Sequence, residues 1–225
     1  MIIVTGGNQG IGKAICERLT KQGEEVVSIS RGPTELRLEH FQCDVSDAAA
    51  LREIALQLKR DKREISGLIN AAGIASMNLL VMTPPETVER VIDTNLLGTI
   101  YSCQSFVPMM IRSKSGVVIN FSTIAVALSL QGEAVYAASK AGVESFSHTF
   151  AREVSSFGIR VNCIAPGPID TNLLRGVSRN KIEEIISSQV IRRQFSTSDV
   201  CDVVEVLLDK KFQSISGQVL SIGGN

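Results

Sequence analysis

Hydrophobic and polar positions change period repeatedly along the chain. Short runs rich in β-branched residues alternate with longer stretches in which apolar residues recur at helical spacing. The predicted strands are Ile2–Val4, Val26–Ser30, Phe41–Cys43, Gly67–Asn70, Val117–Phe121, Arg160–Ile164 and Gln218–Ser221. The predicted helices cover residues 11–22, 47–62, 86–112, 135–156 and 198–209. This alternation predicts βαβ units and a mainly parallel sheet.

The apolar pattern within the strands predicts helices on both sides of that sheet. Val117, Val118 and Ile119 are apolar on both faces of their strand, as a doubly covered sheet requires. No linker, repeat or low-complexity segment interrupts the pattern, so residues 1–225 are interpreted as one Rossmann-like, doubly wound α/β domain with three αβα layers. About nine residues separate the second and third strands. We therefore expect a short or missing helix there, with an exposed patch of sheet face.

Composition narrows the class of protein. The 23 basic residues balance the 23 acidic ones, so the charge favours neither nucleic acid nor an anionic membrane. The five cysteines are scattered without metal-type spacing, which indicates reduced, mostly buried thiols in a cytosol and no metal site. A strand directly after Met1 and the lack of a long apolar run predict a soluble cytoplasmic protein without a targeting segment.

A glycine-rich segment lies between the first strand and the first helix. Glycines allow a tight turn and a close approach of the backbone to a diphosphate, whose charge then faces the amino end of a helix. The segment therefore predicts a dinucleotide-binding loop, with cofactor contacts from Gly6, Asn8, Gln9, Gly10, Ile11 and Gly12.

The end of the second strand bears on the choice of cofactor. Sites for NAD commonly hold the ribose hydroxyls with an acidic residue at this position. Here the residues are Ser30 and Arg31. A guanidinium can hold a 2′-phosphate through paired, charge-assisted hydrogen bonds, so the sequence favours NADP(H), with NAD(H) as the alternative. The alternative interpretation is that Arg31 is a solvated loop residue without a role in cofactor binding.

An ordered series of motifs covers essentially the whole chain. They are the glycine loop Thr5–Gly12, Asp44-Val45, Asn70–Gly73, Asn95, Tyr136-Ala-Ala-Ser-Lys140, Pro166-Gly167 and the closing segment 216–224. The chain thereby resembles the short-chain dehydrogenase/reductase family. Its compactness and the segments Asn-Leu-Leu-Gly at 95–98 and Val-Asn-Cys-Ile-Ala-Pro-Gly at 161–167 look most like the 3-oxoacyl-[acyl-carrier-protein] reductases of that family. The resemblance implies hydride transfer between NAD(P)(H) and a carbonyl or alcohol. It also implies further cofactor contacts at Asp44, Val45, Asn70, Ala71, Ala72, Gly73, Tyr136, Lys140, Pro166, Gly167, Ile169 and Thr171.

Tyr136 and Lys140 are four residues apart in a predicted helix and share one of its faces. A tyrosine with a pKa of about 10 is a poor acid or base at neutral pH. We expect the nearby ammonium of Lys140 to lower the pKa of Tyr136 and so ease proton exchange with the substrate. The resemblance implies that Lys140 also bonds the nicotinamide ribose, and that Asn95 bridges a water to Lys140 through a local break in its helix.

The remaining catalytic position departs from the family pattern. Family members keep a serine thirteen residues before the tyrosine, whereas this chain has Thr123 there, with Ser122 beside it. Threonine keeps the hydroxyl donor and adds a methyl group that stiffens χ1. We favour Thr123, because neighbouring strand-end residues point to opposite faces, and keep Ser122 or a weakened catalyst as alternatives. His40 and His148 are interpreted as structural.

The substrate side is less specific. The resemblance implies that residues 172–197 form a flap and residues 128–135 the opposite wall. The apolar positions of the flap either line a pocket for an acyl chain or pack on the domain. The flap also has a basic character, which either attracts an acidic carrier protein or coenzyme A or is solvated surface charge. The basic residues are Arg175, Arg179, Lys181, Arg192 and Arg193. The leading prediction is reduction of a 3-oxoacyl thioester or similar small ketone. The alternatives are a polyol, sugar or hydroxysteroid dehydrogenase and a weakly active cofactor-binding partner or sensor.

The two long helical stretches also bear on assembly. Residues 86–112 and 135–156 are apolar on more than one face. In the family such helices pair between subunits, so a homotetramer or dimer is expected, with burial against the chain's own sheet as the alternative.

Overall fold

The seven strands form one parallel sheet, as the alternating pattern predicts. The computed structural model describes residues 1–171 and 178–224. The strands are β1 (Ile2–Thr5), β2 (Val26–Ser30), β3 (Glu39–Gln42), β4 (Gly67–Asn70), β5 (Gly116–Phe121), β6 (Ile159–Pro166) and β7 (Val219–Ile222). Their order is β3-β2-β1-β4-β5-β6-β7, and every neighbouring pair is parallel. The order changes direction between β1 and β4, the place where open sheets of this kind bind ligands.

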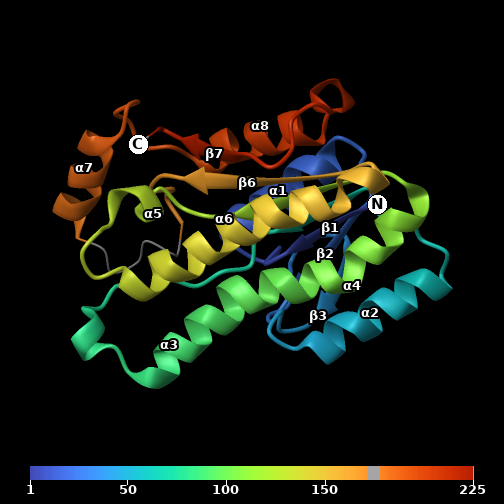
Figure 1. Cartoon of the computed structure of the whole chain (residues 1–225), viewed down its shortest axis with the longest axis horizontal. Helices are drawn as coiled ribbons and strands as arrows, with labels where there is room; N and C mark the ends of the chain where they lie inside the picture. The colour runs from blue at the N-terminus through green and yellow to red at the C-terminus, as the bar shows by residue number, and fades with distance from the viewer. Residues whose placement is uncertain (172–177, 225) are drawn as a thin grey trace.

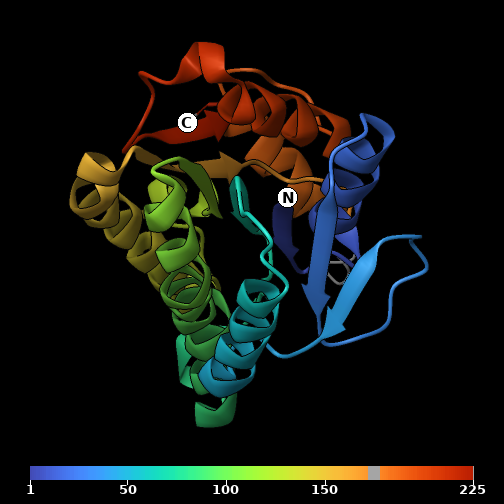
Figure 2. The ribbon, with the colours of Figure 1, turned by 90° about the vertical axis from the view of Figure 1, so that its right-hand side faces the viewer.

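Helices cover both faces of the sheet and give the three layers seen in Figures 1 and 2. The helices are α1 (Gly10–Lys21), α2 (Ala48–Arg60), α3 (Pro85–Ile92), α4 (Gly98–Ser113), α5 (Ala125–Leu128), α6 (Ala134–Val154), α7 (Arg179–Ser188) and α8 (Thr197–Leu208). On one face, α2 packs against α4 and α4 against α6, while α1 packs against α8 on the other. Successive side chains of β1 point to opposite faces of the sheet. Ile2 and Val4 join the core beneath α1 and α8, whereas Ile3 joins the core beneath α2 and α4.

The connection between β2 and β3 contains no helix, in agreement with its short length (Figure 2). The expectation of an exposed sheet face beside it is wrong for β2, which is buried at every position. Leu36 and Leu38 of the connecting loop pack against the core beneath α1 and so cover part of the face that a helix would occupy. Next to this connection, the edge strand β3 keeps exposed positions, at Glu39 and Gln42.

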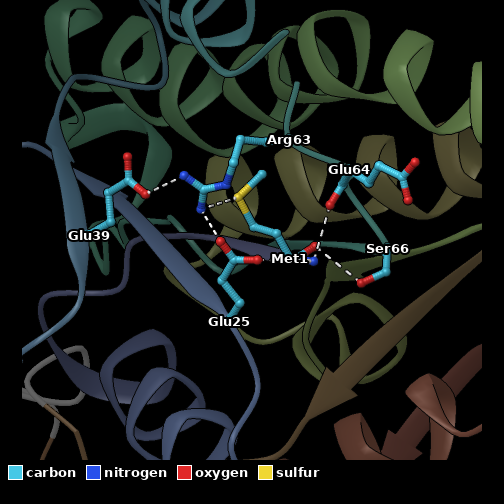
Figure 3. Close-up of polar contacts among 6 residues, drawn as sticks. All are labelled: Met1, Glu25, Glu39, Arg63, Glu64 and Ser66. Atoms are coloured by element: carbon cyan, nitrogen blue, oxygen red, sulfur yellow. Dashed lines mark hydrogen bonds and ion pairs between the residues drawn. The ribbon is translucent and has the colours of Figure 1, made fainter. Parts of the chain in front are cut away.

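Ionic contacts join the amino ends of β1, β2 and β3 (Figure 3). Arg63 lies before β4 and donates hydrogen bonds to Glu25 and, at 3.0 Å, to Glu39. Its guanidinium also contacts the sulfur of Met1, whose amino group donates to the backbone carbonyl of Glu64 at 3.1 Å. We name Met1, Glu25, Glu39 and Arg63 the amino-end cluster. This cluster joins the edge strand β3 to the rest of the sheet, next to the β2–β3 connection that contains no helix.

Candidate active site

A cavity of about 300 Å³ opens at the carboxyl ends of the strands. In Figure 1 this is the end to which the β6 arrow points, where α5 and α7 also lie, opposite the N-terminus. The loop after β1, the ends of β2, β4, β5 and β6, the start of α6 and Ile185 of α7 line it. Residues distant in sequence therefore meet in one place because parallel strands present their carboxyl ends at one edge.

The glycine loop forms one wall of the cavity. Gly6 and Gly10 have φ angles of 71° and 53°, which favour glycine. A Cβ on Gly6 would lie 2.8 Å from the backbone of Ala72, so no side chain fits between these two loops. The helix α1 begins at Gly10, and its first residues Gly10, Ile11 and Gly12 line the cavity, so the amino end of the helix with its free N–H groups lies at the cavity wall. This cradle fits a dinucleotide diphosphate, which needs close backbone and a positive helix end.

Arg31 stands at the rim of the cavity, next to Asp44. Its Nη1 atom is 3.8 Å from Asp44 Oδ2, and its side chain is 56% exposed. Side chains of β3 hold the loop that carries it, since Gln42 donates to the Arg31 carbonyl at 2.9 Å and the His40 ring bonds the Gly32 carbonyl at 3.1 Å. Both bonds fix the backbone on either side of the Arg31–Gly32 peptide. They replace the support that a crossover helix would give this loop.

Tyr136, Lys140 and Thr123 meet in the middle of the cavity lining. The Thr123 hydroxyl is hydrogen-bonded to the Tyr136 phenol. Lys140 follows one turn after Tyr136 on α6, is 4% exposed, and donates from Nζ to the Phe121 carbonyl at 2.8 Å. The three side chains thus place a weak acid, a hydroxyl donor and a cation within one buried site.

The electrostatics differ from the expectation for Tyr136. Burial, followed by the charge of Glu133, raises the pKa of Tyr136 to about 12, and the hydrogen bond from Thr123 opposes this only in part. Burial lowers the pKa of Lys140 to about 8. The expected lowering of the Tyr136 pKa by Lys140 is therefore wrong in this structure, because Lys140 is not among the groups that shift this pKa and desolvation is the largest influence on it. Tyr136 is held as a neutral phenol, the form that gives a proton.

The structure separates Thr123 from Ser122. Whereas Thr123 bonds Tyr136, the Ser122 hydroxyl donates to the Glu144 carboxylate at 2.5 Å and lies 3.5 Å from the Lys140 carbonyl. Both residues line the cavity, but only the Thr123 hydroxyl is joined to the phenol. The opposite orientation of neighbours at the end of β5 is the physical cause.

Asn95 lies in a π-helical turn, Asp93–Leu97, which interrupts the predicted helix 86–112. It is fully buried, accepts a hydrogen bond from the Ile74 amide at 2.8 Å and donates to the Ser139 hydroxyl at 3.0 Å. A Cβ on Gly73 would lie 3.3 Å from Asn95 Oδ1 and 3.4 Å from Lys140 Nζ. Gly73 therefore keeps the space between Asn95 and Lys140 free of side chain.

Most of the cofactor positions named from the sequence meet at this cavity. Those that line it are Gly6, Asn8, Gln9, Gly10, Ile11, Gly12, Ser30, Arg31, Asp44, Val45, Ala71, Ala72, Gly73, Tyr136, Lys140, Pro166, Gly167, Ile169 and Thr171. Asn70 and Asn95 are not among the lining residues. Asn70 points into the core and donates to Asn120 at 2.8 Å, since its place in β4 directs it away from the loop that follows.

The sequence predicted residues 128–135 as a wall of the site but did not single out Glu133, which lines the cavity with only 4% of its surface exposed. An acidic residue three positions before the tyrosine was the available signal. Burial raises the pKa of Glu133, and the charge of Lys181 opposes the shift. Leu130, Met77 and Ile185 complete an apolar part of the lining around it.

The helix α7 brings part of the predicted flap to the cavity. Ile185 is buried and lines the cavity, as expected for a pocket position, whereas Val190 and Ile191 are exposed and have neither of the two expected roles. Lys181 donates to the Gln131 carbonyl at 2.6 Å and joins α7 to the opposite wall. Two basic side chains are paired, Arg179 with Glu183 and Arg193 with Asp199. The predictions for Arg175 and for the apolar flap positions between residues 172 and 177 fall outside the described residues.

The other sequence candidates have structural surroundings. The His148 ring bonds the Gly217 carbonyl at 2.9 Å, and His40 bonds Ser28 and Gly32. The five cysteines are free and buried. In residues 1–171 and 178–224, no three His, Cys, Asp or Glu side chains are grouped so that they could hold a metal ion. No helix within the same ranges is long and apolar enough to cross a membrane.

Comparison with known proteins agrees with this geometry. The profile of the family described as short chain dehydrogenase matches residues 1–182. The chain belongs to this family. Over 235 residues it is 31% identical to the 3-oxoacyl-[acyl-carrier-protein] reductase FabG of Staphylococcus epidermidis, covering 99% of this chain and 96% of that one. This short-chain dehydrogenase is therefore an NAD(P)-dependent oxidoreductase with a Rossmann-like fold.

Two solved structures with a bound nicotinamide cofactor share the fold of nearly the whole chain. One is 4-hydroxyisoleucine dehydrogenase complexed with NADH, with a TM-score of 0.90, 26% identity, and coverage of 99% of this chain and 97% of that one. The other is ElxO with NADP bound, with a TM-score of 0.88, 28% identity, and coverage of 98% and 96%. These similar folds thus include one with each of the two nicotinamide cofactors.

Proposed function

We propose that this short-chain dehydrogenase uses NADP(H) to reduce the ketone of a 3-oxoacyl thioester to a secondary alcohol. The observation that carries the proposal is the hydrogen-bonded pair Thr123–Tyr136 beside Lys140, in the cavity that also holds the glycine loop. The similarity to FabG of Staphylococcus epidermidis supports the choice of a 3-oxoacyl substrate. The acyl group would be carried by coenzyme A or by an acyl carrier protein.

In the proposed reaction the bound nicotinamide supplies the hydride. Tyr136 donates its phenolic proton to the ketone oxygen, which becomes the alcohol hydroxyl. Its raised pKa keeps the phenol protonated in the neutral range but also makes it a weaker acid, so proton transfer depends on groups that stabilise the phenolate as it forms. Thr123 offers the second hydroxyl at that oxygen, and the buried Lys140 ammonium stabilises the phenolate that remains.

Asn95 acts in this proposal as a positioning residue. Its amide group holds the backbone of Ile74 and the Ser139 hydroxyl, on either side of the space kept open by Gly73. That space lies next to Lys140 Nζ. A water placed there would link Asn95 with Lys140 and return a proton to Tyr136 after each turnover.

The preference for NADP(H) rests on Arg31. Its exposed guanidinium at the cavity rim supports binding of a 2′-phosphate, and the bonds from His40 and Gln42 hold its backbone. The neighbouring Asp44 carboxylate, 3.8 Å away, neutralises part of that charge in the free protein. The similar fold of ElxO with NADP bound agrees with this choice.

We extend the proposal to assembly and location. Phe146 and Phe150 of α6 stack with ring centroids 5.1 Å apart and, with Tyr101 and Met109 of α4, are only partly buried against the core. Such a helix face supports pairing of subunits as a homodimer or homotetramer. The five unpaired cysteines support a reducing compartment, the cytoplasm.

The test is oxidation of NADPH and NADH by acetoacetyl-CoA, with Tyr136→Phe as the blank. Turnover with NADPH that disappears in the blank supports the proposal. Arg31→Ala then raises the KM for NADPH at least tenfold and the KM for NADH less than threefold, because only NADPH loses a charge-assisted contact. An equal change for both cofactors would reject the role of Arg31. Absence of turnover with either cofactor favours a binding subunit.

A further inference from the structure

Glu133 is a buried acidic group of the cavity that the proposed proton transfer does not use. It is the residue before α6 begins, one helical turn ahead of Tyr136, and 4% exposed. Glu133 lines the cavity, and its carboxyl oxygens are not among the fully buried, unpartnered side-chain oxygens of the described residues, which are Asn70 Oδ1 and Gln189 Oε1. The carboxyl group is therefore open to the cavity, where a polar group of the ligand can reach it.

The charged groups that face Glu133 come from two helices. Lys181 of α7 favours its ionised form, but the ammonium already donates to the Gln131 carbonyl at 2.6 Å. Tyr136 of α6 is the other titratable neighbour, and the charge of Glu133 raises its pKa. Burial is the largest influence on Glu133 and raises its pKa. An acyl chain that expels water from Leu130, Met77 and Ile185 strengthens this influence and favours the protonated carboxyl.

A protonated carboxyl differs from a carboxylate in having a hydrogen to donate. Tyr136 and Glu133 then present two O–H donors from the same end of α6. A 3-oxoacyl thioester carries two carbonyl acceptors separated by a single methylene group. The two donors equal the two acceptors in number and line the same cavity, so the ketone can bond Tyr136 while the thioester carbonyl bonds Glu133.

We propose that Glu133 determines substrate specificity by donating a hydrogen bond to the second carbonyl of a 1,3-dicarbonyl substrate. This inference rests on the proposed function, in which that second carbonyl belongs to the thioester. It assigns Glu133 to substrate selection, and leaves the transferred proton with Tyr136. A ketone without a second carbonyl leaves the Glu133 donor unpaired and binds less well.

The experiment compares kcat/KM with NADPH for acetoacetyl-CoA, ethyl acetoacetate and 2-pentanone. The variants are Glu133→Gln, which keeps an N–H donor, and Glu133→Ala, which has none. The exposed carboxylate of α7 supplies a matched control, Glu183→Gln. The readout is the kcat/KM for ethyl acetoacetate divided by the kcat/KM for 2-pentanone. We expect Glu133→Ala to lower this ratio at least tenfold, mainly through the KM for ethyl acetoacetate, and Glu133→Gln to keep it within threefold of the wild-type value.

The pH profile separates specificity from a structural role. In the wild type, the KM for the dicarbonyl rises as pH rises through the pKa of Glu133, since the donor is lost, while Glu133→Gln gives a flat profile. A ratio unchanged in Glu133→Ala, or an equal fall in both Glu133 variants, would overturn the inference. If the enzyme reduces ethyl acetoacetate with this dependence on Glu133 but does not reduce acetoacetyl-CoA, the proposed thioester substrate is rejected and the role of Glu133 stands. If it reduces neither dicarbonyl, the proposed function and the role of Glu133 are both rejected.

Discussion

Charged groups at the amino end of the sheet and at its carboxyl end differ in pairing and in burial. At the amino end, Arg63 is bonded to both Glu25 and Glu39, and the Met1 amino group is bonded to the backbone. At the carboxyl end, Glu133 and Lys140 are both 4% exposed, and burial displaces the pKa of each toward its neutral form. One end uses charge to hold strands together, and the other holds titratable groups away from water.

This difference indicates where stability and chemistry lie in the molecule. Paired charges near solvent cost little and give a small stabilisation. Buried ionisable groups cost several kcal/mol in general, and they persist where a site needs shifted proton affinities. Changes at the carboxyl end should therefore lower activity without lowering stability much, and changes at the amino end should lower stability and leave activity unchanged. Four variants test this contrast.

Tyr136→Phe should give the largest effect. Loss of the phenolic proton donor is expected to lower kcat on the order of a hundred- to ten-thousandfold. The ring remains and fills the same space, so the thermal midpoint should stay within about 2 °C of the wild type. Steady-state kinetics and a thermal melt measure both. A variant that keeps more than a tenth of the wild-type kcat would show that another group gives the proton.

Lys140→Met sharpens the contrast through pH. The pKa of Lys140 is lowered from 10.5 to about 8, so between these values the unfolded chain binds a proton that the folded chain lacks. Stability of the wild type therefore gains a contribution as pH rises from 8 to 10.5, and carries the full penalty below pH 8. We expect the variant to lose activity, and to gain free energy of unfolding at pH 7 on the order of 2 kcal/mol.

Denaturant unfolding of both proteins from pH 6 to 10.5 measures the effect of Lys140. The wild type should approach the variant in stability toward the alkaline end. Two parallel stability profiles would mean that burial of the ammonium carries no such penalty. The lost hydrogen bond to the Phe121 carbonyl works against the gain, so a smaller gain at pH 7 with converging profiles still supports the argument.

Thr123→Ala separates the two candidate hydroxyls. Its removal takes the partner of Tyr136 away, and we expect turnover to fall more than tenfold. Ser122→Ala should not lower turnover to this extent, because the Ser122 hydroxyl is bonded to Glu144 instead. Parallel kinetics of the two variants decide the matter. Equal activity of Thr123→Ala and the wild type would reject the role of Thr123.

Arg63→Ala should give the smallest effect. It removes two ion pairs from the amino-end cluster, and the free energy of unfolding should fall by about 1 kcal/mol, less at high salt. The kcat should not change, since the cluster lies at the opposite end of the strands from the cavity. Urea unfolding at low and high salt, beside steady-state kinetics, tests this. A large loss of activity without loss of stability would contradict the division between the two ends.

Much of the fold could be predicted from the pattern of residues. The strands and their parallel arrangement follow from alternating periodicity, and the loop at Gly6 and Gly10 follows from the need for positive φ angles. The missing helix before β3 follows from chain length alone. Its consequence does not, because whether Leu36 and Leu38 would cover β2 depends on packing between distant segments.

The candidate site divides in the same way. Most of the cofactor positions come from local motifs at strand ends, and they meet at the cavity. Asn70 belongs to such a motif but turns into the core, and Glu133 belongs to no motif but turns into the cavity. The orientation of one side chain depends on which neighbours pack around it, and spacing along the chain does not contain that information.

The sequence by itself determined the order of elements, the glycine loop and the helical spacing of Tyr136 and Lys140, because each depends on neighbouring residues. Tertiary structure alone decided the proton affinities. The pKa of Tyr136 is raised where the spacing to Lys140 indicated a fall, since burial is the largest influence on it and the charge of Glu133 adds to the rise. Desolvation depends on everything that surrounds a group, and only the folded chain brings those surroundings together.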